Sequence, residues 1–125
     1  MGESVLIVDD HAGFREHARR LLECEGYSVV GEAVDCASAV AAARALRPRL
    51  VLVDVHLPDA DGFELTGLLL QLPVPPLVVL TSSHDRTEIE PCVAGCGARG
   101  FVPKADLSRD AIEELVAGAS EEPVA

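Results

Sequence analysis

The chain has 125 residues, of which 49% are hydrophobic and 25% are charged, and this is the length and composition of one ordinary globular domain. Ten Lys and Arg residues stand against 21 Asp and Glu, so the net charge is −11, and the aromatic residues are one Tyr and three Phe. A negative field repels nucleic acid and anionic lipid, and bases find no aromatic platform to stack on, so we expect this chain to bind neither nucleic acid nor membrane.

The first residues and the longest apolar runs bear on where the protein resides. Residues 1–4 include an acidic residue and no basic one, and the apolar stretch at residues 5–8 is far shorter than the core of an export signal. No apolar run approaches the roughly 18 residues that a membrane-spanning helix needs. We therefore expect a soluble, cytoplasmic protein.

Short apolar runs recur along the chain, and their starts lie roughly 22 to 27 residues apart, the length of a strand, a loop and a helix. The expected strands are residues 5–8, 28–30, 50–53, 77–80 and 100–102. Three of these runs are apolar throughout, which is typical of strands that helices cover on both faces. The pattern predicts a parallel sheet.

Between the runs, apolar residues follow the 3.6-residue period of helices. The expected helical stripes are residues 14–22, 39–46, 65–72, 89–96 and 112–119. The fourth is the weakest, because Pro91 and Gly95 interrupt it and a proline past the first turn removes a backbone donor. We expect that helix to be short or mobile.

Five strands alternating with five helices predict an α/β fold, a (βα)5 doubly wound five-stranded parallel sheet with right-handed crossovers. One domain, residues 1–119, accounts for the pattern. Residues 120–125 have no periodicity, so we expect them to form a disordered C-terminal tail.

In a doubly wound sheet the ligand site lies outside the carboxyl ends of the strands. Polar residues follow four of the five runs there: Asp9 and Asp10 after the first, Asp54 after the third, residues 81–83 after the fourth and Lys104 after the fifth. We therefore expect three carboxylates, a group of hydroxyls and one lysine to meet at one edge of the sheet.

Such a set of residues favours a divalent cation and an anionic ligand. Carboxylates a few ångströms apart raise one another's pKa unless a cation neutralises them, and Mg²⁺ prefers oxygen ligands. A lysine adds a second positive charge, and a hydroxyl can donate to an incoming anion. These groups together can hold a phosphoryl group beside a carboxylate nucleophile, which is the arrangement that an aspartyl phosphate needs.

With Leu57-Pro58 and Asp61-Gly62 behind Asp54, the ordered set resembles the receiver domain of bacterial two-component response regulators. The resemblance extends from Val5 to about Ala119. It implies the flavodoxin-like receiver fold. As a function it implies that the domain accepts a phosphoryl group from a sensor histidine kinase and signals by a change of its surface.

The resemblance also implies a role for each residue at the strand ends. Asp54 would be the phosphoacceptor, and Lys104 would pair with the phosphoryl group. Asp9 and Asp10 would be the acidic pair that serves Mg²⁺, together with Asp54 and the backbone carbonyl of His56.

Two further residues would belong to the switch. Counting back from Lys104 without gaps puts the switch hydroxyl on Ser82, with Thr81 as the alternative if the loop carries an insertion. Phe101 fits the aromatic residue that turns inward on activation. The face that would change consists of the fourth helix, the fifth strand and the fifth helix, and the protein would be a monomer or a phosphorylation-dependent homodimer through that face.

The sequence departs from the family at the residue after the lysine. Receivers often have a proline there with a cis bond, whereas here Ala105 follows Lys104 and Pro103 precedes it. A cis bond before a residue other than proline costs about 2.5–4 kcal/mol, so we expect a trans bond. This feature is more like receivers whose output is a helix-turn-helix. The partner in output would be a separate protein or a C-terminal output domain that is lost from this chain.

Three other functions compete with this interpretation. A degenerate receiver would serve as a phosphorylation-independent interaction scaffold, which the complete set of charged site residues disfavours. A phosphatase with an Asp-x-Asp motif needs a second aspartate where His56 stands. A flavodoxin-like cofactor carrier needs a glycine-rich phosphate loop after the first strand. We expect no separate enzyme but a signalling phosphoacceptor that catalyses its own phosphotransfer and slow autodephosphorylation.

Overall fold

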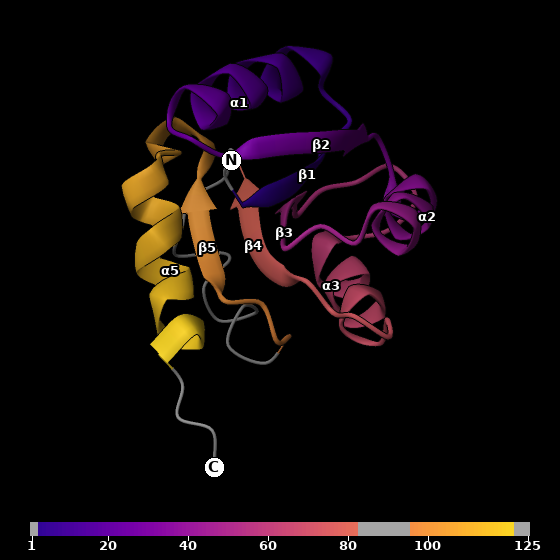
Figure 1. The fold of residues 1–125 in the computed structure, drawn as a ribbon. Helices are drawn as coiled ribbons and strands as arrows, with labels where there is room; N and C mark the ends of the chain where they lie inside the picture. Colours follow the sequence, from indigo (N-terminus) through magenta and orange to yellow (C-terminus); the bar gives the residue numbers. More distant parts are fainter. Residues whose placement is uncertain (1–2, 83–95, 122–125) are drawn as a thin grey trace.

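Five parallel strands form one sheet at the centre of the molecule (Figure 1). The computed structural model describes residues 3–82 and 96–121. The sheet order is β2-β1-β3-β4-β5, and the strands are β1 (Ser4–Val8), β2 (Ser28–Ala33), β3 (Leu50–Asp54), β4 (Leu77–Ser82) and β5 (Gly100–Pro103). Because the chain adds strands on both sides of β1, the sheet is doubly wound, and the expected α/β fold is confirmed.

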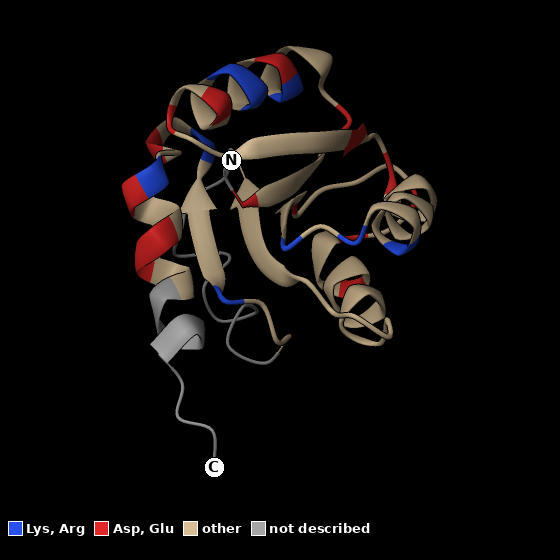
Figure 2. Cartoon of the chain, in the orientation of Figure 1, with Lys and Arg blue, Asp and Glu red and all other residues tan. Residues whose placement is uncertain are grey.

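Helices cover both faces of this sheet (Figure 1). The helices α1 (Ala12–Cys24) and α5 (Arg109–Glu121) pack on one face, and α2 (Cys36–Leu46) and α3 (Gly62–Leu70) pack on the other. A short 3₁₀ turn, η1 (Lys104–Asp106), follows β5. Charged residues lie mostly in the helices and loops, and few lie in the strands (Figure 2).

The core lies in two layers because successive side chains of a strand point to opposite faces. In β1, Leu6 and Val8 join the cluster with α2 and α3, whereas Val5 and Ile7 join the cluster with α1 and α5. All four are at most 1% exposed. Full burial of such a side chain stabilises the fold by about 1.5–3 kcal/mol. Burial on both faces explains why this run is apolar at every position.

The register of the strands brings the polar residues together. Val8 at the end of β1 pairs with Val53, and Asp54 at the end of β3 pairs with Thr81. Ser82 at the end of β4 pairs with Pro103 at the end of β5. Since all four pairings are parallel, the residues that follow these strands lie at one edge of the sheet.

Several elements differ in length from the sequence pattern. β2 continues to Ala33, beyond the apolar run 28–30, because its backbone pairs with the whole of β1. β4 continues through Thr81 and Ser82, which the apolar run left outside the strand. Polar residues extend both strands because strand pairing is made by the backbone, whatever the side chain.

The C-terminal half also departs from the expected boundaries. α5 ends at Glu121, two residues beyond Ala119. Residues 122–125 and the whole of the expected fourth helix before Cys96 lie outside the described residues. The Lys104–Ala105 bond is trans, as expected. Among the helices of residues 3–82 and 96–121, none is long and apolar enough to span a bilayer.

Candidate phosphoacceptor and metal site

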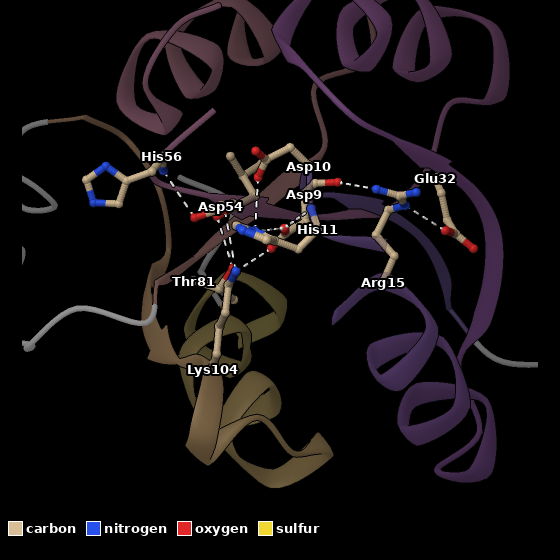
Figure 3. A network of polar contacts seen from close by, with 10 residues as sticks. Asp9, Asp10, His11, Arg15, Glu32, Asp54, His56, Thr81 and Lys104 are labelled. Carbon is tan, nitrogen blue, oxygen red and sulfur yellow. Dashed lines mark hydrogen bonds and ion pairs between the residues drawn. The ribbon is translucent and has the colours of Figure 1, made fainter. Parts of the chain in front are cut away.

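Two of the three aspartates at the edge of the sheet are buried. Asp9 directly follows β1 and is 0% exposed, and Asp54 is the last residue of β3 and is 3% exposed. Asp10 is more accessible, with 37% of its side chain exposed. Figure 3 shows the three aspartates near one another, with the Lys104 side chain extending toward Asp9 and Asp54. The structure thus brings together the residues that the strand-end pattern predicted.

Lys104 is the cation of this cluster. Its Nζ lies 2.7 Å from Asp9 Oδ2 and donates a hydrogen bond of 3.4 Å to Asp54 Oδ2. It also lies 4.5 Å from the centroid of the Phe14 ring on α1, a cation–π distance. Lys104 can reach both buried carboxylates because it begins the turn η1 directly after β5.

The surroundings of the Asp54 carboxylate disfavour its ionised form. Burial raises the pKa of Asp54 above its ordinary value, and the nearby charge of Asp9 raises it further. The backbone N–H of His56, which donates to Asp54 Oδ1 at 3.1 Å, and the ammonium of Lys104 oppose the rise in pKa. The net direction is upward, so one lysine does not fully offset two buried carboxylates.

The donor set fits a hard divalent cation. Asp9, Asp10, His11 and Asp54 each offer one ligand atom, and these atoms lie within 4.8 Å of one another. Asp9 Oδ2 is buried without a hydrogen-bond donor among the described residues, and its contact with Lys104 is an ion pair outside hydrogen-bonding geometry. Mg²⁺ is bound in proteins through one or two carboxylates and several waters, and this cluster can supply the carboxylates.

His11 lies closer to the acidic pair than the sequence indicated. Its Nδ1 is 3.2 Å from Asp9 Oδ1 and 3.1 Å from Asp10 Oδ1, although 71% of the side chain is exposed. Its backbone N–H donates to Asp9 Oδ1 at 2.8 Å. Adjacency to Asp9 and Asp10 in the sequence was the available signal for this contact.

Arg15 holds the Asp9 backbone from α1, and sequence reasoning missed it. Its Nη1 donates to the Asp9 carbonyl at 2.7 Å, and its Nε donates to Glu32 Oε1 on β2 at 3.0 Å (Figure 3). The Asp9 N–H donates to the Ala33 carbonyl at 3.0 Å. No local pattern marks the ion pair between Arg15 and Glu32, because the two residues are 17 positions apart.

The loop after Asp54 turns tightly into α3. Val55 N donates to the Thr81 carbonyl at 2.9 Å, and Gly62 N donates back to the Val55 carbonyl at 2.7 Å. A Cβ on Gly62 would lie 2.7 Å from the Asp54 carbonyl oxygen and 2.9 Å from Val55 Cα, so only glycine fits. The imidazole of His56 points away from Lys104 (Figure 3).

Thr81 and Ser82 are both buried, but they face opposite layers. Thr81 pairs with Asp54, and its Oγ1 donates to the Val53 carbonyl at 3.4 Å. Ser82, which is 0% exposed, lies two residues after Leu80, the partner of Phe101 in the sheet register. Ser82 therefore lies on the same face of the sheet as Phe101, whose ring is already buried at 8% exposure.

Known proteins are similar to this chain in sequence and in fold. The family model of the response regulator receiver domain matches residues 5–117. The transcriptional regulatory protein PdtaR of Mycobacterium tuberculosis is 38% identical over 86 residues, which are 69% of this chain and 42% of that protein. A protein-glutamate methylesterase/protein-glutamine glutaminase of Anaeromyxobacter dehalogenans is 41% identical over 80 residues, 63% of this chain and 24% of its own.

A solved crystal structure has the same fold. A two-component response regulator of the LuxR family from an Aurantimonas species superposes with a TM-score of 0.84 and 32% identity, over 94% of this chain and 87% of that one. The chain spans about half or less of the length of the curated relatives it matches. The fold, the acidic edge of the sheet and these likenesses agree, and the chain belongs to the response regulator receiver domain family.

Proposed function

We propose that this domain accepts a phosphoryl group on Asp54 from the phosphohistidine of a sensor histidine kinase, in the presence of Mg²⁺. One observation carries the proposal: Asp54 lies buried at the sheet edge, and Lys104 Nζ bridges it to Asp9, at 3.4 Å from Asp54 Oδ2 and 2.7 Å from Asp9 Oδ2, with Asp10 in the same acidic cluster. A carboxylate nucleophile beside a cation and a metal-binding pair is the arrangement that phosphoryl transfer to an aspartate needs.

In the transfer step a carboxylate oxygen of Asp54 attacks phosphorus while the bond from phosphorus to the donor nitrogen breaks, and the imidazole leaves. Lys104 stabilises negative charge on the phosphoryl oxygens, from a position where it already contacts both buried carboxylates. Return to the resting state is hydrolysis, in which water attacks phosphorus and the Asp54 carboxylate is released. The protein thus catalyses its own phosphotransfer and dephosphorylation as a signalling phosphoacceptor.

Mg²⁺ would be held by Asp9, Asp10, Asp54 and the backbone carbonyl of His56, and it supplies charge neutralisation at the phosphoryl oxygens. Asp9 contributes an oxygen that has no donor in the described residues. Asp10 contributes the more accessible carboxylate, which a hydrated ion can reach from solvent. The chain's own residues therefore orient the acceptor and reduce repulsion at the moment of transfer.

The switch proposed here uses Ser82 and Phe101. Ser82 shares the Phe101 face of the sheet, so a movement of its hydroxyl toward a phosphorylated Asp54 would leave space beside the Phe101 ring. Thr81 is the alternative, but its side chain lies on the face of the sheet opposite to Phe101. Phosphorylation would then shift the population of a two-state surface that includes β5, α5 and the segment before Cys96.

The signal would pass from a cytoplasmic portion of a histidine kinase to an output that this chain does not contain. That output is either a separate protein or a domain C-terminal to α5, in keeping with relatives about twice as long as this chain. The activated receiver would act as a monomer or as a homodimer through the switched face.

Intact mass after incubation with acetyl phosphate tests the proposal directly. We expect a single phosphate adduct in the wild type with Mg²⁺, and no adduct with EDTA or in Asp54→Asn. Absence of an adduct in the wild type under every condition would overturn the proposal and favour the phosphorylation-independent scaffold. An adduct that persists in Asp54→Asn would place the acceptor elsewhere.

A further inference from the structure

One carboxylate ties the acceptor loop, residues 55–61, to a helix far away in the sequence. Asp59 Oδ1 accepts a hydrogen bond from Cys36 N at 2.8 Å, and Asp59 Oδ2 accepts one from Ala37 N at 3.1 Å. These are the first two residues of α2, and they precede Asp59 by 23 and 22 residues. The loop that leaves the phosphoacceptor is therefore fixed to a neighbouring element as well as to its own strand and helix.

The helix does not need Asp59 as its cap. Asp35 is the N-cap residue of α2, and its side chain accepts from Ser38 N at 2.8 Å in a capping box. The N–H groups of Cys36 and Ala37 remain, and the first N–H groups of a helix have no partner within the helix. Asp59 takes these two donors, at the end of the helix where a negative charge is most favoured.

The two ends of the same loop are already held. At its start, His56 N donates to Asp54 Oδ1 at 3.1 Å. At its end, Asp61 caps α3 by accepting from Glu64 N at 2.8 Å, and His56 and Asp61 form an isolated antiparallel bridge. Asp59, between these ends, makes the contact that sets the loop against α2.

We propose that Asp59 is a positioning residue of the phosphoacceptor site. By holding the loop on the N-terminus of α2, it sets where the His56 backbone lies relative to the Asp9–Asp10 pair. This inference rests on the proposed Mg²⁺-dependent function. Residues that orient metal ligands without touching the metal typically change affinity about 10–100-fold, and Asp59 acts through the backbone of a neighbour, so we expect the lower end of that range.

Calorimetric titration of Mg²⁺ into the whole chain tests the inference with four proteins: wild type, Asp59→Ala, Asp59→Asn and Asp35→Ala. We expect Asp59→Ala to raise the dissociation constant for Mg²⁺ about 10-fold. Asp59→Asn keeps one oxygen acceptor, so its affinity for Mg²⁺ should lie between those of Asp59→Ala and the wild type. Asp35→Ala is the matched control, because it removes a cap from the same helix without touching the acceptor loop, and it should leave Mg²⁺ affinity within about twofold of wild type.

Three results would overturn the proposal. The first is a Mg²⁺ dissociation constant in Asp59→Ala within twofold of wild type. The second is an equal loss in Asp35→Ala, since stability of α2 would then be the cause. The third is absence of Mg²⁺ binding by the wild type. A wild type that binds Mg²⁺ and forms no adduct with acetyl phosphate refutes the proposed phosphotransfer while leaving the role of Asp59 intact, so the two failures are distinguishable.

Discussion

Lys104 joins the two buried carboxylates of the site. Its ammonium pairs with the side chains of both Asp9 and Asp54. It also lies over the Phe14 ring. A change at this residue therefore alters the resting protein, and under the proposed function it also alters the transfer step.

We expect Lys104→Ala to slow phosphorylation of Asp54 about 10²–10³-fold, the usual effect of removing one group that stabilises developing negative charge. The rate is measured by intact mass in a time course with acetyl phosphate and saturating Mg²⁺. Lys104→Arg keeps the positive charge, so its phosphorylation rate should fall less than that of Lys104→Ala. An unchanged rate in Lys104→Ala would exclude Lys104 from the transfer step.

The second prediction at the level of a residue concerns Asp54 and the dependence of stability on pH. Its pKa is raised in the folded protein, chiefly by burial, so the folded state binds this proton more readily than the unfolded state. Stability is therefore highest below the unfolded pKa and falls as pH rises through the folded pKa. Above the folded pKa and without metal, the ionised Asp54 carboxylate destabilises the protein.

Asp54→Asn removes that charge, so we expect it to be more stable than wild type at pH 7 in EDTA, with a rise in Tm of about 3–6 °C for each kcal/mol gained in a domain of this size. The difference should shrink as pH falls toward about 4 and be absent below it, where the wild-type carboxyl is protonated in both states. Thermal unfolding at several pH values measures it. Equal Tm values at neutral pH would show that Lys104 fully compensates Asp54.

At the scale of elements, the tight turn from β3 into α3 depends on one glycine. A Cβ at Gly62 would meet the backbone of Asp54 and Val55 at less than 3 Å, whereas a Cβ at Gly67, on the same helix, meets nothing within 4 Å. Backbone atoms cannot move aside as a flexible side chain can. The acceptor itself would therefore have to shift.

We expect Gly62→Ala to destabilise the protein by about 1–3 kcal/mol and to reduce phosphorylation of Asp54. Gly67→Ala is the matched control, and it should stabilise the protein by about 0.5–1 kcal/mol because alanine is the better helix former. Urea unfolding and the acetyl phosphate assay measure the two effects. A Gly62→Ala variant as stable and as active as wild type would show that the turn can relax.

At the scale of the whole molecule, the net charge of −11 and the acidic site both respond to cations. Mg²⁺ that binds the folded state alone stabilises it by about 2.7 kcal/mol at 100 times its dissociation constant. Added salt of any kind also screens self-repulsion in so acidic a chain. The two effects must therefore be separated at equal ionic strength.

We expect MgCl₂ to raise the Tm of the wild type more than NaCl does at the same ionic strength. Asp10→Asn should lose most of the Mg²⁺-specific rise while keeping the response to NaCl, because it removes an accessible ligand and leaves the overall charge strongly negative. Thermal unfolding of both proteins in both salts measures this. Identical curves in the two salts for the wild type would mean that no specific site is filled.

The fold and the meeting of the carboxylates and Lys104 at one edge of the sheet were predictable because their signals are local in sequence. Five apolar runs at strand length and the helical periods between them predicted the sheet, and the order of Asp9, Asp54 and Lys104 at the run ends predicted one shared edge. Strand ends were less predictable: Thr81 and Ser82 belong to β4 because the backbone pairs with β3 and β5, which no side-chain pattern records.

By itself, then, the sequence determined the fold class, the edge of the sheet that bears the site and the carboxylates and lysine that meet there. Only the tertiary structure decided which supports hold those groups: Arg15, which links the Asp9 carbonyl to Glu32 on β2, and Asp59 on the first turn of α2. The physical reason is the separation of the contacting residues along the sequence. Periodicity and strand-end order report neighbours along the chain, whereas a hydrogen bond between residues 23 positions apart exists only after two helices and a strand have packed.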